Sequence, residues 1–126
     1  MNKKIIISSV LLVVAVVFVF FVSTQNKNKN QAPEDENQII LFYGDGCPHC
    51  AVVDKYIKDN KVEDKVTFTR KEVFNNRNNL KDLKKKAEAC NLPTNSLGVP
   101  FLWDGKNCLM GEQDVTNFFQ QKINEL

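Results

Sequence analysis

The hydrophobic pattern changes character along the chain. Its first part holds one uncharged apolar run, Ile5 to Val22, which only two serines interrupt. As a helix this run would be about 27 Å long, enough to cross the hydrocarbon core of a bilayer. Residues 23–37 are rich in Asn, Lys, Gln and acids without apolar periodicity, which is typical of a flexible, solvated linker. The pattern therefore predicts a membrane anchor, a linker and then a folded domain.

Apolar positions in residues 38–126 alternate between strand-like and helix-like spacing. The segments with strand patterns are Gln38–Tyr43, Val66–Val73, Val99–Trp103 and Asn107–Met110. The segments with one apolar stripe, as in an amphipathic helix, are Pro48–Asn60, Asn75–Asn91 and Asp114–Leu126. The order β-α-β-α-β-β-α predicts an α/β domain with a four-stranded mixed sheet and helices on both faces.

Two of these segments carry more detailed expectations. In the second strand we expect Val66, Phe68 and Val73 to face inward. Between the last two strands, Asp104-Gly105 is a typical two-residue hairpin sequence, so the last strand pair is expected to be antiparallel.

The residues around the apolar run predict its topology. Residues 1–4 include Lys3 and Lys4, which favour a cytoplasmic amino terminus, although Lys27 and Lys29 lie close on the other side. A cleaved signal peptide is the alternative, but its apolar region is usually about 7–15 residues and ends at a small-x-small site. This run is longer and no good cleavage site follows it. We expect residues 5–22 to be a single-pass signal anchor, with the domain on the extracytoplasmic side.

The candidate chemistry lies in Cys47-Pro48-His49-Cys50, between a buried strand and a helix. Cys47 falls at the predicted helix amino terminus, where unpaired N–H groups and the helix dipole favour a thiolate, the nucleophile of disulfide exchange. Pro48 suits the first turn of a helix. Cys50 lies one turn on, where it can attack a mixed disulfide and release the partner. We expect His49 to be cationic or to donate a hydrogen bond toward Cys47, and the alternative is a histidine that merely faces solvent.

The string FYGDGCPHC, followed by GVPFLWDG and GEQD, resembles the thioredoxin/glutaredoxin superfamily over residues 38–126. The CPHC tetrad is similar to that of oxidising periplasmic proteins of the Dsb type, and the compact topology is closer to glutaredoxins. The stretch from Cys90 to GEQD also resembles the thioredoxin-like domains of bacterial vitamin K epoxide reductase homologues. The resemblance implies that Val99-Pro100 is a cis-proline loop beside the active cysteines, where the Val99 backbone pairs with a bound substrate chain.

The chain departs from its relatives in ways that bear on function. Thioredoxins have a buried acid at the position of Leu41 and a tryptophan at that of Gly46, so a general thioredoxin role is less expected. Glutaredoxins receive glutathione at a Gly-Gly pair before the last helix. Here Gly111 is followed by Glu112, an acid where the anionic tripeptide would approach, which makes glutathione a doubtful partner.

Cys90 and Cys108 remain once Cys47 is assigned to Cys50. A structural disulfide, two inert buried thiols and an auxiliary redox pair are the interpretations left open. Zinc is disfavoured because this pair lacks a second CxxC, and a c-type haem would need His where Ala51 stands. We expect no metal or organic cofactor.

The expected function is thiol–disulfide exchange on exported protein substrates at a bacterial membrane, with a membrane or exported redox partner that regenerates the cysteines. The alternatives are a non-catalytic redox-sensing or adaptor module and a cytosol-facing glutaredoxin-like reductase. The net charge of +2 is too balanced to suggest a nucleic-acid partner. The direction of electron flow does not follow from the sequence.

Overall fold

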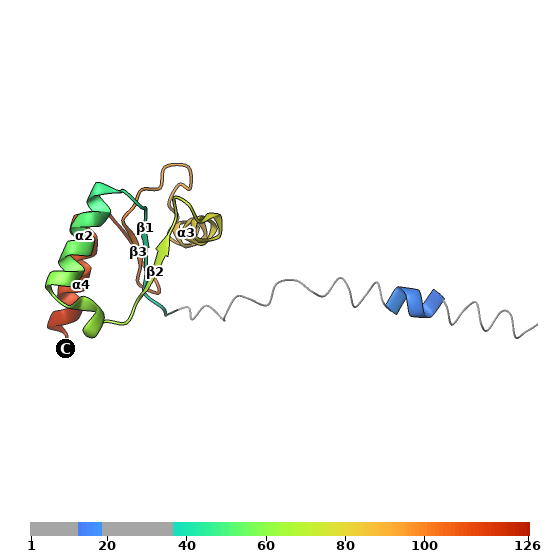
Figure 1. Cartoon of the computed structure of the whole chain (residues 1–126), viewed down its shortest axis with the longest axis horizontal. Coiled ribbons are helices and arrows are strands. Elements are labelled where there is room, and N and C mark those ends of the chain that lie inside the picture. The colour runs from blue at the N-terminus through green and yellow to red at the C-terminus, as the bar shows by residue number, and fades with distance from the viewer. Residues whose placement is uncertain (1–12, 19–36) are drawn as a thin grey trace, which may run out of the picture. The chain divides into compact units, whose positions relative to one another are not determined.

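The computed structural model describes residues 13–18 and 37–126 (Figure 1). Residues 13–18 form one helical segment. Within the two described ranges, no helix has the length and apolar character that crossing a bilayer requires. Apart from residues 13–18, the predicted anchor at 5–22 lies outside the described residues, as do residues 1–4 and linker residues 23–36.

The domain has the element order expected from the hydrophobic pattern, with ends that differ by a few residues. Its elements are β1 (Ile40–Tyr43), α2 (Pro48–Asp59), the short 3₁₀ turn η1 (Val62–Asp64), β2 (Thr69–Glu72), α3 (Arg77–Ala89), β3 (Phe101–Trp103), β4 (Cys108–Met110) and α4 (Glu112–Asn124). The sheet order is β2-β1-β3-β4, in which β1 pairs with β2 in parallel and the other two pairs are antiparallel. The α/β prediction of a four-stranded mixed sheet is confirmed.

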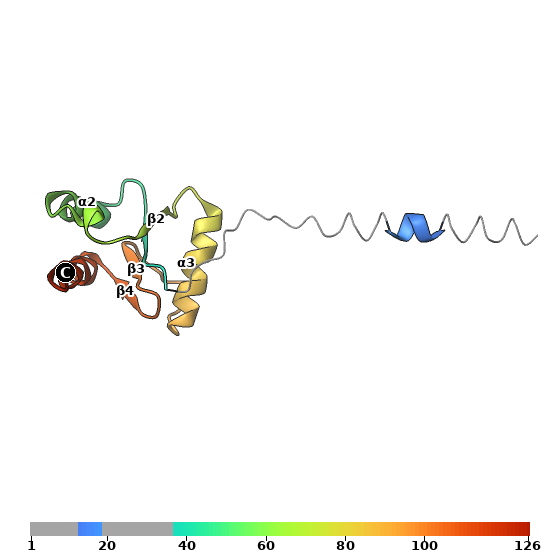
Figure 2. The ribbon, with the colours of Figure 1, turned by 90° about the horizontal axis from the view of Figure 1, so that it is seen from below.

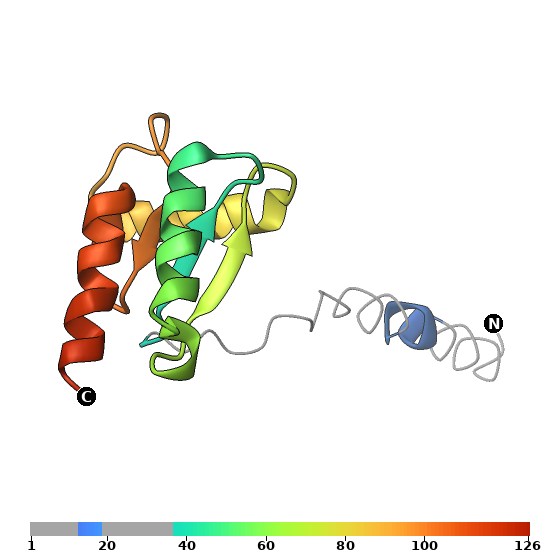
Figure 3. The ribbon, with the colours of Figure 1, turned by 60° about the vertical axis from the view of Figure 1, so that its left-hand side comes forward.

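Helices cover both faces of the sheet, as predicted. Figure 2 shows α2 and α4 on one side of the strands and α3 on the other, and Figure 3 shows α2 and α4 side by side in front of the sheet. Residues of β1 alternate between the two layers, because successive side chains of a strand point to opposite faces. Leu41 packs with α2 and α4, whereas Ile40 and Phe42 pack with α3. This explains why the strand is almost wholly apolar.

The second strand differs from the prediction. Instead of Val66–Val73, β2 covers only Thr69–Glu72, a wholly polar stretch. Val66 and Phe68 pack against the α2 and α4 layer before the strand begins, and Val73 joins the α3 layer after it ends. The strand tolerates polar residues because it lies at the edge of the sheet, where its backbone pairs with β1 alone.

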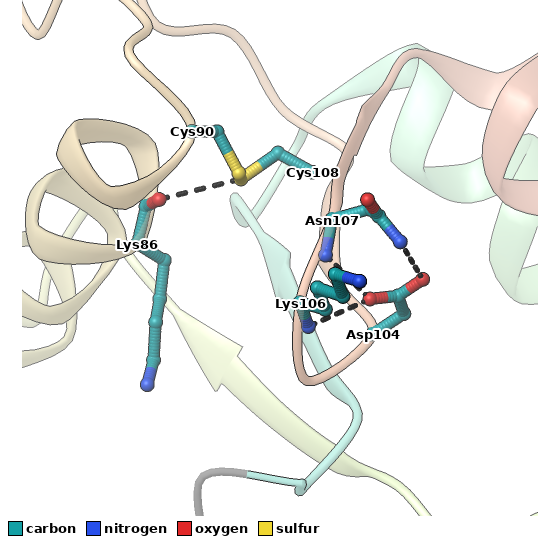
Figure 4. The surroundings of a disulfide bond; sticks show 6 residues. All are labelled: Lys86, Cys90, Asp104, Lys106, Asn107 and Cys108. Carbon is teal, nitrogen blue, oxygen red and sulfur yellow. Dashed lines mark hydrogen bonds between the residues drawn. A yellow bond between two sulfur atoms is a disulfide. The ribbon is translucent and has the colours of Figure 1, made fainter.

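The turn between β3 and β4 is centred one residue later than predicted. The backbone N–H of Asp104 donates to the carbonyl of Asn107 at 3.1 Å, so Gly105 and Lys106 are the central pair. The Asp104 carboxylate accepts the backbone N–H groups of Lys106 and Asn107, at 2.8 and 2.6 Å (Figure 4). Gly105 has φ +100°, and a Cβ there would lie 3.0 Å from the backbone of Asn37. Glycine is therefore required at this turn.

A disulfide joins Cys90, at the carboxyl end of α3, to Cys108, the first residue of β4 (Figure 4). Their Cα atoms are 6.2 Å apart. The bond ties the helix on one face to the edge strand farthest from β2. Of the three interpretations of this pair, the bond excludes two inert thiols and agrees with either a structural disulfide or an auxiliary redox pair.

Candidate active site

The turn between β1 and α2 places Cys47 at the amino terminus of the helix. Gly46 has φ +76°, and the backbone N–H of Cys47 donates to the Gly44 carbonyl at 3.2 Å, which closes the turn. Cys47 is the residue that caps α2, and Pro48 follows as the first helical residue. Proline is tolerated there because the first N–H groups of a helix have no intrahelical acceptor.

The Cys47 sulfur is hydrogen-bonded to the amino-terminal end of α2. Its Sγ accepts the backbone N–H of Cys50 at 3.2 Å, as a side chain that caps a helix does. A hydrogen bond to a sulfur anion is favoured over one to a neutral thiol, and the helix dipole acts in the same direction. Because Cys47 is only half-buried, a substrate can reach its sulfur.

The second thiol has different surroundings. Cys50 is 8% exposed, and it packs one helical turn behind Cys47. Burial, with a smaller contribution from its hydrogen bond to Cys47, raises the pKa of the Cys50 thiol to about 11. Both thiols are free in the structure. The two cysteines therefore differ: one is accessible, and the other is buried and held in its protonated form.

The Val99-Pro100 loop lies against the first of these cysteines. The peptide bond between the two residues is cis. The Cys47 Sγ lies 3.6 Å from the Val99 carbonyl oxygen, although 52 residues separate them in the chain. The Pro100 carbonyl in turn accepts the backbone N–H of Gly111 at 2.9 Å, which attaches this loop to the start of α4. The Val99-Pro100 loop thus lies between Cys47 and the start of α4.

His49 does not make the predicted contact with Cys47. Instead, Nδ1 of His49 is hydrogen-bonded at 2.9 Å to Oε2 of Glu112, the first residue of α4. The ring points to α4 because His49 follows Cys47 by two residues in a helix, so the two side chains leave in different directions. The sequence pattern marks Glu112 only as an acid near a possible glutathione site and gives no signal that it is the partner of His49.

Two hollows flank Cys47. One, of about 300 Å³, is lined by Cys47 and Cys50 together with the charged residues Asp54 and Arg70. The other, of about 600 Å³, is lined by Cys47, Val99 and mainly apolar side chains, among them the exposed Phe74. A side chain or main chain of a bound polypeptide would find space on both sides of the sulfur.

An ion pair in the smaller hollow was not foreseen. Arg70 of β2 contacts the carboxylate of Asp54 on α2, and Lys58 approaches the same carboxylate at 2.8 Å. The hydrogen bonds of Lys58 and Arg70 hold the pKa of the Asp54 carboxyl below its usual range. Arg70 is paired in register with Leu41 of β1. No signal in the sequence pointed to this pair, since its members belong to different elements.

No group of three or more His, Cys, Asp or Glu side chains within residues 13–18 and 37–126 is arranged to hold a metal ion. No protein-family model matches the chain, and no curated protein matches it.

Proposed function

We propose that this chain is a thiol–disulfide oxidoreductase of the thioredoxin/glutaredoxin superfamily, tethered to a membrane and acting on exported proteins. The observation that carries the proposal is the asymmetry of the two thiols. Cys47 is accessible and hydrogen-bonded at a helix amino terminus, whereas Cys50 is buried one turn behind it. A nucleophile and a resolving thiol need these two environments.

The exchange proceeds in two steps. The Cys47 thiolate attacks one sulfur of a substrate disulfide, the S–S bond breaks, and the other sulfur leaves with the electron pair. Cys50 then loses its proton and attacks the Cys47 sulfur, which releases the second substrate thiol and leaves a 47–50 disulfide. The substrate is reduced by two electrons and the protein is oxidised by two. Run in reverse, the same steps oxidise a substrate dithiol.

The Val99-Pro100 loop supports substrate docking beside the nucleophile. The Val99 backbone lies within van der Waals reach of the Cys47 sulfur, and the hollows on both sides leave room for an extended chain. A polypeptide that adds its backbone to Val99 would bring a cysteine of the substrate next to Cys47. The proposal assigns no cofactor, because the two cysteines carry the electrons themselves.

The test uses the full chain in a nonionic detergent. The reduced protein is incubated with an insulin substrate, and the oxidised protein with reduced ribonuclease, to measure reduction and oxidation separately. We expect activity in at least one assay, its loss in Cys47→Ser, and accumulation of mixed disulfides in Cys50→Ser. A Cys90→Ala/Cys108→Ala variant is the matched control, since it removes two cysteines away from the site. If the wild-type chain is inactive in both assays and Cys50→Ser traps no mixed disulfide, the enzyme proposal fails.

The membrane tether and the direction of electron flow have their own tests. A reporter that is active only outside the cytoplasm, fused after Leu126, should be active if residues 5–22 hold the domain on the extracytoplasmic side. Activity only of a cytoplasmic reporter would favour the glutaredoxin-like alternative. The reduction potential of the 47–50 couple decides the direction: a value near about −120 mV indicates an oxidant and one near about −270 mV a reductant.

A further inference from the structure

The pair formed by His49 and Glu112 has no part in the exchange as written above. We propose that His49, positioned by Glu112, donates a proton to the sulfur that leaves the substrate disulfide when Cys47 attacks. The inference rests on the proposed exchange chemistry and adds a proton donor to its first step.

The pair joins the amino-terminal ends of α2 and α4. His49 is two residues beyond Cys47 in α2. Glu112 follows Gly111, whose backbone N–H is bound to the Pro100 carbonyl at 2.9 Å. The same loop places the Val99 carbonyl 3.6 Å from the Cys47 sulfur. Cys47 and His49 both lie at the exposed amino-terminal end of α2, where a substrate disulfide has to approach.

The carboxylate determines which ring nitrogen is available. A carboxylate ion accepts hydrogen bonds only, so Nδ1 of His49 donates to Glu112 at 2.9 Å and keeps its hydrogen. The other nitrogen, Nε2, is then the one that can give up or take back a proton. The His49 side chain is 71% exposed, so the ring can recover that proton from solvent. Glu112, at 40% exposed, is the more enclosed partner and holds the ring in place.

The step balances in atoms and charge. The Cys47 thiolate forms a new S–S bond with the nearer substrate sulfur, and the substrate S–S bond breaks. The electron pair of that bond goes to the far sulfur, which takes the Nε2 proton of the His49 imidazolium and departs as a neutral thiol. The imidazole that remains still donates its Nδ1 hydrogen to Glu112. Histidine suits this task because its ring can both give up a proton and take one back.

The need for this proton depends on the leaving sulfur. An alkyl thiolate is a basic, poor leaving group, and its departure is assisted when a proton arrives in the transition state. The thiolate released from a nitrophenyl disulfide is a stable anion at neutral pH and has no basic ring nitrogen, so it needs no proton. A proton donor therefore accelerates the attack on alkyl disulfides and leaves the attack on nitrophenyl disulfides unchanged.

The experiment compares two uncharged probes, so that removing the charge of Glu112 does not alter their attraction. The full chain carrying Cys50→Ser, in nonionic detergent, is mixed with bis(2-hydroxyethyl) disulfide or with bis(4-nitrophenyl) disulfide. Mixed-disulfide formation at Cys47 is followed by rapid quenching and mass spectrometry. Glu112→Gln, His49→Gln and the double variant are made in this background. Asp114→Asn is the matched control, since it removes another first-turn acid of α4 that does not contact His49.

General acid catalysis by a positioned side chain contributes about 10²-fold or more, so we expect both single variants to react at least about tenfold more slowly with the alkyl probe. Their rates with the nitrophenyl probe should stay within about twofold of the parent. The double variant should be no slower than His49→Gln, because Glu112 acts through His49. Asp114→Asn should behave like the parent with both probes.

Two results would overturn the inference. Equal slowing with both probes would mean that the pair only supports the structure of the site, and unchanged rates with the alkyl probe would mean that it donates no proton. Failure of the underlying function is recognised separately, by the absence of Cys47-dependent turnover in the insulin and ribonuclease assays of the wild-type chain.

Discussion

The disulfide between Cys90 and Cys108 allows a quantitative stability prediction. The two residues are 18 positions apart, so the bond closes a loop of about 19 residues in the unfolded chain. For a loop of that size, the chain-entropy relation gives about 11 cal/mol/K, or about 3 kcal/mol at 25 °C. The bond should therefore supply a large share of the stability of a domain of this size, which is typically about 5–15 kcal/mol.

The perturbation is Cys90→Ala/Cys108→Ala, made in a Cys47→Ser/Cys50→Ala background so that the redox state of the active site does not change. Urea unfolding of the full chain in nonionic detergent is followed by the fluorescence of Trp103, the only tryptophan. This side chain is 8% exposed, and its neighbour across the strand pair is Cys108. With a slope of about 1.5 kcal/mol/M, the loss of about 3 kcal/mol lowers the unfolding midpoint by about 2 M.

The single variants test the mechanism. Each alone breaks the bond, so Cys90→Ala and Cys108→Ala should each cost about as much as the double variant, and their effects should not add. If the two effects add, or if the midpoint falls by less than about 0.5 M, the stability does not come from restraint of the unfolded chain. The argument from loop closure would then be wrong.

Other predictions concern the active-site helix and the core. The pKa of the buried Cys50 thiol is raised to about 11, so the folded state keeps this proton at a pH where the unfolded state loses it. The free energy of unfolding should therefore fall as pH rises toward 11. Urea titrations should show a steeper fall in the reduced wild-type protein than in Cys50→Ala. A Cβ at Gly44 would lie 2.3–2.5 Å from ring atoms of Phe74, but that residue is 60% exposed and its ring can turn into solvent. Gly44→Ala should therefore lower the free energy of unfolding by less than about 1 kcal/mol in thermal unfolding. A larger loss would show that the ring is held in place. Phe119 is fully buried, and the centre of its ring lies 4.9 Å from that of Phe68. Phe119→Ala should therefore lower the free energy of unfolding by about 3–5 kcal/mol, measured in urea. A loss near 1 kcal/mol would mean that the core collapses around the gap.

Much of the fold could be predicted because its signals are local. The apolar run of β1 and the stripes of the helices follow from the spacing of neighbouring residues, and the structure confirms their order and type. β2 could not be located correctly, because a polar edge strand has no hydrophobic pattern of its own. Its position depends on pairing with β1, which is a tertiary property. The hairpin turn shifted for a local reason: the Asp104 side chain accepts the backbone N–H groups of Lys106 and Asn107 and so caps the turn.

The candidate site divides in the same way. The sequence by itself determined the cysteine pair, its place between a strand and a helix, and the presence of proline at residue 100, since these depend on residues next to one another in the chain. Only the tertiary structure decided which distant groups face them. It brought Val99 to Cys47 across 52 residues, turned His49 to Glu112 across 63, and joined Cys90 to Cys108. The physical reason is that packing on the two faces of the sheet, which no local pattern records, determines which loops meet.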